Sequence, residues 1–334
     1  MQVNDAWIFT SACLAIIPLA IIIGDATEQI AAYTGPKIGG LINATMGNIP
    51  ELFIGVFAVK AGLYGLVLAS MVGSIIGNIM LVLGLSILSG GLLYKFQSLD
   101  RNIARSHFSL LCFAAVSMVV PLAFEVTNAG DANVERGLTV LSFAMSLLLI
   151  YVLGLIFSFV THRNLFVQYE REGNGMEPKW TLRVALIVLA VAATFVAIES
   201  ELLVATVEGT VKEIGLPEAF IGVIIVPLIG NVAEHASAII MARKNKIDIS
   251  LEIAVGSSMQ IAMFVAPSLV LLSFLMGKPL IYVYDSFEVV AVLTGILIAL
   301  FVFQDGETYW LEGALLLFCY IIFGIAFFFV QLPV

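Results

Sequence analysis

The sequence predicts an all-α polytopic membrane protein with about ten transmembrane helices in two inverted five-helix repeats. Three observations carry this prediction: an apolar composition, a series of long apolar segments, and polar motifs repeated at one interval. Of the 334 residues, 61% are hydrophobic and 12% are charged, whereas soluble domains have about 45–50% apolar and about 25% charged residues. So few charges do not cover the surface of a soluble domain of this length.

The composition also excludes several classes of protein. The net charge of −9 argues against nucleic acid as a partner, because phosphate groups need basic patches. The three cysteines, Cys13, Cys112 and Cys319, lie in apolar segments without a CxxC motif, which argues against a disulfide framework or a zinc site. The chain has neither GxSxG nor HExxH, two motifs of hydrolase sites. We therefore expect no enzyme and no cofactor, and a lipid bilayer as the surroundings.

Each predicted span is an apolar stretch of about the 20 residues that a helix needs to cross the hydrocarbon core. The apolar stretches are continuous, which predicts helices, because strands of a membrane barrel alternate apolar and polar residues. The predicted spans are residues 7–32, 38–60, 64–90, 105–124, 134–161, 180–207, 217–242, 250–276, 286–303 and 310–330.

The spans divide into two halves of five. Residues 1–161 form the first repeat, residues 162–179 a cytoplasmic linker, and residues 180–334 the second repeat. With residue 1 outside the cytoplasm, most of the 15 Lys and Arg residues lie on the inner side, as the positive-inside rule requires. Ten spans then place both termini outside. The compact loops favour a prokaryotic plasma membrane, with a vacuole-like organelle as the alternative, and homo-oligomerisation stays open.

Two polar motifs recur at the same interval in the two halves. GNIPE begins at Gly47 and GNVAE at Gly230, 183 residues apart, and the same interval separates Gly73 from Gly256, each of which precedes a serine. An odd number of spans in each half reverses the second half in the membrane. This is the plan of many secondary transporters, whose binding site lies near the midplane where the repeats meet.

Each repeated pentapeptide ends in a glutamate inside an apolar span, Glu51 and Glu234. A charge at the centre of such a helix costs at least about 2.5–3.5 kcal/mol. A single glutamate would be explained by protonation and a bond to a neighbouring helix. Two at equivalent positions favour a binding site. Asn48 and Asn231 lie three residues earlier and share a helix face with them.

Neutral oxygen donors complete the predicted site. Ser74 and Asn78 share a helix face, as do Ser257 and Gln260. Carboxylate, amide and hydroxyl oxygens suit hard divalent cations such as Ca²⁺, Mg²⁺ or Mn²⁺. Two carboxylates balance one divalent cation, and an empty, doubly charged site in a low dielectric is costly. The carboxylates can be neutralised by a metal ion or by protons, which predicts that the site exchanges one for the other.

Further polar residues have two interpretations each. His235 relays protons or tunes Glu234, or it makes an ordinary packing hydrogen bond. Glu28 and Glu201, in the first span of each half, line an ion path or lie at the membrane interface. Breaker residues flank both carboxylate helices and predict either helix breaks or close helix packing; they are Gly47, Pro50, Pro227 and Gly230.

Three stretches resemble the Ca²⁺/H⁺ antiporters, the CAX family of the cation/Ca²⁺ exchanger superfamily. They are LAIIPLAIIIGDATEQIA, GNIPELFIGVFAVKAGLYGLVLASMVGSIIGNIMLVLG and FIGVIIVPLIGNVAEHASAIIMARKNKIDISLEIAVGSSMQIAMFVAP. The resemblance implies a five-plus-five inverted-repeat fold, with Glu51 and Glu234 as the central Ca²⁺ and H⁺ carboxylates. It also implies that the first helix of each half slides to alternate access. The signature positions around the site are matched by Asn48, Asn231, Ser74, Ser257 and Gln260.

The function expected from these features is secondary active exchange of Ca²⁺ for H⁺ by alternating access. Mn²⁺ stays an alternative cargo. A Na⁺- or K⁺-coupled Ca²⁺ exchanger keeps the same fold, but the amide of Gln260 leaves fewer carboxylates for several Na⁺ ions. A cation channel is the lower alternative, because repeats with breaker residues at the midplane favour a transporter.

Overall fold

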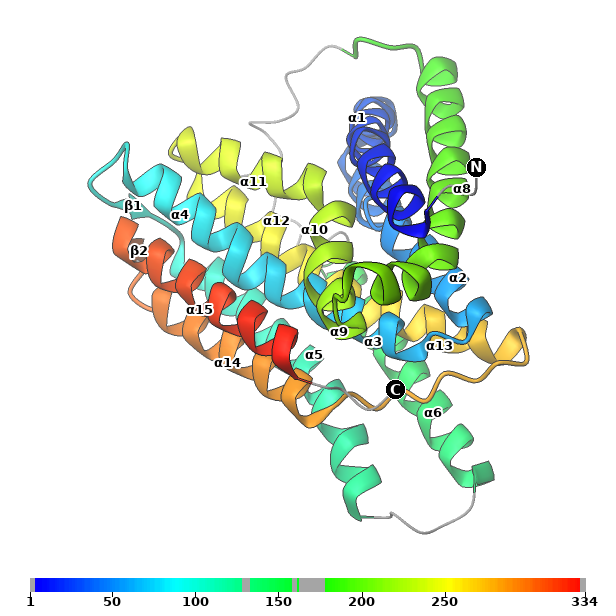
Figure 1. Cartoon of the computed structure of the whole chain (residues 1–334). Helices are drawn as coiled ribbons and strands as arrows, with labels where there is room; N and C mark the ends of the chain where they lie inside the picture. Colours follow the sequence, from blue (N-terminus) through cyan, green and yellow to red (C-terminus); the bar gives the residue numbers. More distant parts are fainter. Residues whose placement is uncertain (1–3, 128–132, 158–160, 162–177, 331–334) are drawn as a thin grey trace.

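The computed structural model describes residues 4–127, 133–157, 161 and 178–330. In these residues it is a bundle of helices with one short two-stranded sheet (Figure 1). The predicted linker, residues 162–179, lies almost wholly outside them. The prediction of an all-α membrane protein is confirmed.

The first half follows the predicted order of apolar helices. Its elements are α1 (Asp5–Met46), α2 (Ile49–Ala61), α3 (Tyr64–Ile76), the π-helical η1 (Gly77–Val82), α4 (Leu83–Gly91), β1 (Gln97–Ser98), α5 (Arg101–Thr127) and α6 (Asn133–Ile156).

The second half repeats this order with more interruptions. Its elements are α8 (Leu182–Ile214), α9 (Glu218–Phe220), η3 (Ile221–Ile225), α10 (Val226–Gly230), α11 (Val232–Arg243), α12 (Ile247–Gln260), η4 (Ile261–Val265), α13 (Ala266–Leu275), α14 (Ser286–Val302), β2 (Glu307–Thr308) and α15 (Trp310–Phe329).

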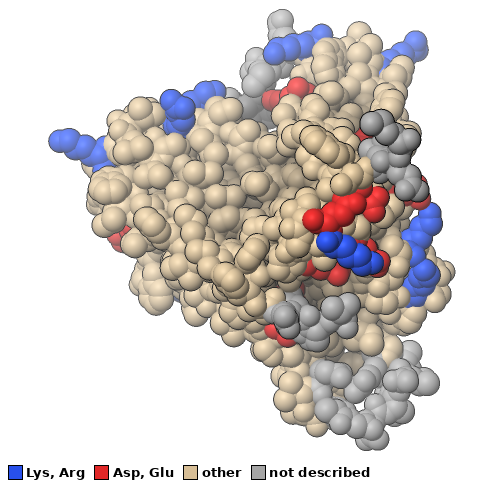
Figure 2. Space-filling view, in the orientation of Figure 1, with Lys and Arg blue, Asp and Glu red and all other residues tan. Residues whose placement is uncertain are grey.

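Seven helices in the described residues are long and apolar enough to span a membrane, and an eighth span is the pair α9–α10 and α11, bent by 63°. The apolar helix α14 is shorter, at 17 residues. The count of ten spans is not fully confirmed and stays a prediction. Figure 2 shows a face whose central and left parts are uncharged, with charged side chains at its edges and in one patch on the right. This surface suits a protein surrounded by lipid.

The first two predicted spans are divided at a different place from the one expected. The sequence predicts a connection between residues 32 and 38, but α1 continues to Met46 and the break lies at Gly47 and Asn48. Pro50 explains this position, because proline is tolerated in the first turn of a helix, where its missing N–H is not needed. The carboxylate helix α2 therefore begins directly at the break.

Two π-helical segments occupy equivalent positions in the halves. The segment η1 begins at Gly77 and η4 at Ile261, within one residue of the interval of 183. Each follows the helix that carries a conserved-interval serine, Ser74 or Ser257. Because π-helical turns re-aim the side chains before and after them and occur often at functional sites, they mark the same region that the repeat marks.

The first helices of the two halves, α1 and α8, pack along each other at one edge of the bundle (Figure 1). Tyr33 Oη donates to the Trp180 carbonyl over 2.7 Å, and Ala6 N donates to Glu213 Oε2 over 3.1 Å. Since the end of one helix meets the start of the other, α1 and α8 are antiparallel. The inverted relation of the two halves requires this arrangement.

Candidate functional site

Glu51 and Glu234 lie in the first turns of α2 and α11, each directly after a helix break. The residues at the breaks adopt nearly the same backbone conformation: Asn48 has φ −97° and ψ 17°, and Asn231 has φ −94° and ψ 11°. From there α2 and α11 extend in opposite directions (Figure 1). The two helix N-termini, which carry partial positive charge, therefore meet at the carboxylates.

The two carboxylates lie close together in the interior. Glu51 is 4% exposed, and Glu234 is near enough to repel it electrostatically. The Glu51 side chain reaches the break in the other half: a Cβ atom placed on Gly230 would lie 2.4 Å from Glu51 Oε1. Only glycine at position 230 leaves room for this carboxylate.

Amide and hydroxyl groups join the halves around the carboxylates. Asn231 Nδ2 donates to Ser74 Oγ over 3.1 Å. Asn48 Nδ2 donates to Gln260 Oε1 over 2.6 Å. Each bond links a residue of one half to a residue of the other, so the predicted donors converge where the repeats meet.

A third link ends on a carboxylate. Asn78 Nδ2 donates to Ser257 Oγ over 3.0 Å, and the Ser257 side chain hydrogen-bonds Glu234. The serine accepts from the amide and uses its own proton for the carboxylate, so Asn78 positions Glu234 through Ser257. Both oxygens of Glu51 lack such a bond in the described part of the chain. The two glutamates thus have similar positions but different surroundings.

The site holds acceptor oxygens that the described residues leave unbonded. They are both carboxylate oxygens of Glu51, Oε2 of Glu234 and Oδ1 of Asn78, all buried. Buried acceptors without a partner cost free energy, and a cation or protons would remove this cost. Among the described residues, no group of three or more His, Cys, Asp and Glu side chains is placed to hold a metal ion. The site therefore depends on two carboxylates supplemented by neutral oxygens, a set that suits Ca²⁺.

The remaining candidates lie outside this cluster. His235 follows Glu234 on α11 and is 8% exposed; adjacent residues on a helix point about 100° apart. Glu28 is exposed on α1. Glu201 is exposed on α8 and pairs with Lys60 over 3.0 Å. The proton role of His235 and the ion-path role of the two glutamates stay predictions. The Lys60 contact was not predicted, although a lysine at the end of an apolar span was a visible signal.

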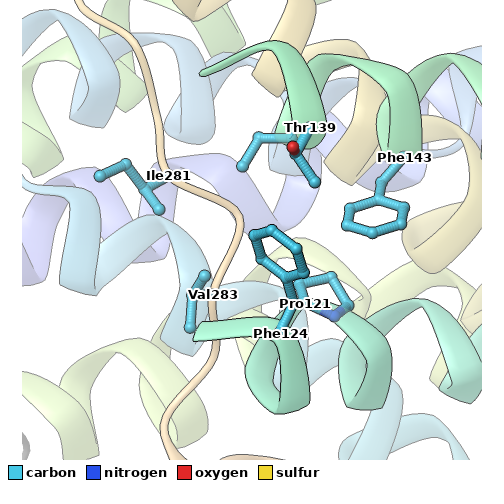
Figure 3. Close-up of a pocket in the computed structure, with 7 residues that line it drawn as sticks. Pro121, Phe124, Thr139, Phe143, Ile281 and Val283 are labelled. Atoms are coloured by element: carbon cyan, nitrogen blue, oxygen red, sulfur yellow. The ribbon is translucent and has the colours of Figure 1, made fainter. Parts of the chain in front are cut away.

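An apolar pocket elsewhere serves as a contrast. It has a volume of about 260 Å³ and lies between α5, α6 and the segment before α14 (Figure 3). Phe124, Phe143 and Val283 are among its lining residues, and Thr139 supplies its one hydroxyl group. None of the predicted site residues lines it. A pocket of this composition offers no ligand set for a cation.

Two similar halves with paired carboxylates between them define a membrane transport protein, and not an enzyme. Residues 5–160 and 184–329 match the family described as "Sodium/calcium exchanger protein". The chain belongs to this family, and the predicted resemblance to the cation/Ca²⁺ exchangers is confirmed.

Three similar proteins cover nearly the whole chain. The Ca(2+)/H(+) antiporter ChaA of Bacillus subtilis (strain 168) is 46% identical over 336 residues, which are 98% of this chain and 93% of the relative. The Ca(2+)/H(+) antiporter of Aphanothece halophytica is 45% identical over 341 residues, 98% and 91%. The structure of native YfkE superposes with a TM-score of 0.86 at 42% identity and covers 99% of this chain and 94% of that chain. The predicted exchanger fold is confirmed.

The close approach at Gly230 gives a testable prediction. In Gly230→Ala the new methyl group would overlap Glu51 Oε1 and displace that carboxylate from the site. We expect the Ca²⁺ concentration for half-maximal transport to rise about tenfold, the effect of about 1–3 kcal/mol of overpacking. Gly154→Ala is the control, because no described atom lies within 4 Å of its new Cβ. Unchanged half-saturation in Gly230→Ala would contradict the placement of Glu51.

Proposed function

We propose that this chain exchanges Ca²⁺ for H⁺ across a membrane by alternating access, with Glu51 and Glu234 binding Ca²⁺ or protons in turn. The observation that carries the proposal is the meeting of these two glutamates at helix breaks, with buried acceptor oxygens left unbonded. Two relatives with 45% and 46% identity bear the name Ca(2+)/H(+) antiporter. Both supports point to the same pair of ions.

The chemistry of the exchange follows from the charge of the site. With Ca²⁺ bound, two carboxylates neutralise one divalent cation, and the amide and hydroxyl oxygens of the cluster replace part of its hydration shell. When Ca²⁺ leaves, the carboxylates would be two like charges in a low dielectric. Protons neutralise them and let the site reorient without Ca²⁺. Because the empty, charged site is the costly state, the two fluxes are coupled.

The individual ligands are part of this proposal. Besides the glutamates, the Ca²⁺ ligands are drawn from Asn78, Ser257 and the bonded pairs Asn48–Gln260 and Asn231–Ser74. Gln260 already accepts a hydrogen bond from Asn48, so it adds no charge for extra Na⁺ ions. Mn²⁺ is the alternative cargo, since it also binds carboxylate and amide oxygens. We assign the protein to a plasma membrane with the C-terminal end of α2 outside, following its positive charges.

The proposal is tested by Ca²⁺ flux into liposomes that contain the purified protein, with a pH gradient and a Na⁺ gradient imposed separately. We expect a pH gradient alone to drive Ca²⁺ against its own gradient, with protons moving the other way. Protein-free liposomes are the control. Flux that needs Na⁺ or K⁺ at constant pH would replace the coupling ion, and steady current without a counter-ion would indicate a channel.

A further inference from the structure

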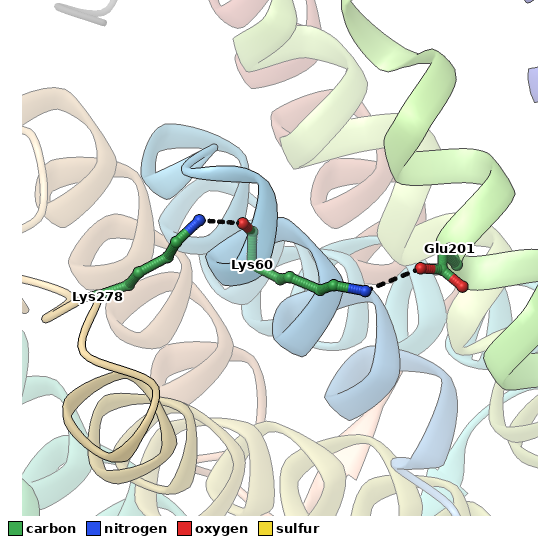
Figure 4. A network of polar contacts seen from close by, with 3 residues as sticks. All are labelled: Lys60, Glu201 and Lys278. Atoms are coloured by element: carbon green, nitrogen blue, oxygen red, sulfur yellow. Dashed lines mark hydrogen bonds and ion pairs between the residues drawn. The ribbon is translucent and has the colours of Figure 1, made fainter.

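An ion pair outside the site joins the two halves (Figure 4). Lys60 lies at the end of α2 and its Nζ is 3.0 Å from Glu201 Oε1 on α8. Both side chains are more than half exposed, at 59% and 55%. The carboxylate helix of the first half is thus tied to the first helix of the second half.

The repeat supplies a second set of the same residues. The interval of 183 residues that relates Glu51 to Glu234 also relates Lys60 to Arg243, near the end of α11. Glu201 on α8 has a counterpart in Glu28 on α1, and each directly follows a buried hydroxyl residue. The structure therefore offers two equivalent cross-half pairs, one at the end of each carboxylate helix.

Only one of the two pairs is formed. Glu28 and Arg243 are both exposed, and neither makes an ion pair with any other described residue. Since α2 and α11 extend from the site in opposite directions (Figure 1), the two pairs belong to opposite sides of the site. We call them the Lys60 side and the Arg243 side. The two sides differ in this conformation.

The ends of both carboxylate helices are anchored on either side. Tyr94 Oη donates to the Arg243 carbonyl over 3.3 Å, and Lys278 Nζ donates to the Lys60 carbonyl (Figure 4). Each anchor comes from the half opposite to the helix that it holds. Because α2 and α11 are held alike, the difference between the sides is carried by α1 and α8, which pack along each other.

We propose that Lys60–Glu201 and Glu28–Arg243 are alternating ion pairs, formed one at a time as the site opens first to one side and then to the other. The proposal rests on the alternating access of the proposed function. A lone carboxylate in an apolar helix is costly, so breaking one pair favours the conformation that forms the other. This gives Glu28 and Glu201 a role that does not require either to touch the ion.

Cross-linking tests this without measuring transport. A variant without native cysteines carries Glu28→Cys and Arg243→Cys, together with a protease site inserted within residues 162–177. A short bis-maleimide that links the two cysteines keeps the halves joined after proteolysis. We expect a low yield with Lys60 present and a rise of up to about fivefold in Lys60→Gln, because an exposed ion pair contributes up to about that factor. Lys60→Arg restores the low yield.

The matched control is Lys212→Gln. Lys212 pairs with Glu208 over 4.0 Å within α8 itself, so its removal leaves the contacts between the halves unchanged and should not alter the yield. A yield that Lys60→Gln leaves unchanged overturns the proposal, as does a pair that never cross-links in any variant that elutes as folded protein. Because the readout needs no Ca²⁺, a failure of the proposed transport would appear separately, in the liposome flux.

Discussion

Replacing either central glutamate, in Glu51→Gln or Glu234→Gln, is expected to lower Ca²⁺/H⁺ exchange below about 1% of the unmodified rate while the protein still folds. Glutamine keeps the size of the side chain but leaves one charge against a divalent cation. Removing one partner from a buried charged pair costs about 3–5 kcal/mol, which is more than about 100-fold. The measurement is Ca²⁺ uptake driven by a pH gradient in liposomes.

Glu288→Gln is the matched control for this experiment. Glu288 is also buried, at 3% exposure, but its Oε2 accepts from Asp285 N over 2.9 Å at the start of α14. Glutamine can accept the same bond, so we expect transport close to that of the unmodified protein. Normal exchange in Glu51→Gln or Glu234→Gln, with the control behaving as expected, would contradict the roles assigned to the two carboxylates.

The positions of the site residues along the chain were predictable because polar residues are rare in this sequence. Glu51 and Glu234 stand out in apolar spans, and the interval of 183 residues identifies them as equivalents. An inverted repeat then places equivalents near each other at the midplane. The structure brings them together at matching helix breaks.

The partners of the hydrogen bonds were not predictable from the repeat. Symmetry would pair Asn48 with Ser257, as Asn231 pairs with Ser74, but Asn48 bonds Gln260. The reason is that Asn78 occupies Ser257, and the residue 183 positions after Asn78 is apolar. The two halves differ at one polar position, and the bonds rearrange around it.

The surroundings of Glu28 and Glu201 depend on tertiary packing. Both follow a buried residue on a long helix and both are exposed. The local sequence of an apolar helix does not say which face meets its neighbours when the apolar residues surround it on every side. The helix boundary near Met46 has the same origin, since hydrogen bonding continues α1 through a stretch that contains glycine and proline.

Gly73→Ala and Gly256→Ala are expected to have very different effects on stability, although the repeat makes the two glycines equivalent. A Cβ atom on Gly73 would lie 2.1 Å from the Val223 carbonyl oxygen and 2.6 Å from Pro227 Cγ. Backbone cannot move aside as a flexible side chain does, so α3 would be forced away from η3 and α10. No described atom lies within 4 Å of a Cβ on Gly256.

We expect Gly73→Ala to lower the melting temperature in detergent by about 5 °C or more, since overpacking typically costs about 1–3 kcal/mol and backbone contacts raise that cost. Gly256→Ala should leave it unchanged or raise it slightly, because alanine is the better helix former by about 1 kcal/mol. Each substitution serves as the control for the other, since the chemical change and the helix context are the same. Equal melting temperatures would show that α3 does not approach η3 as closely as the structure has it, and that the tight side of the repeat is not at Gly73.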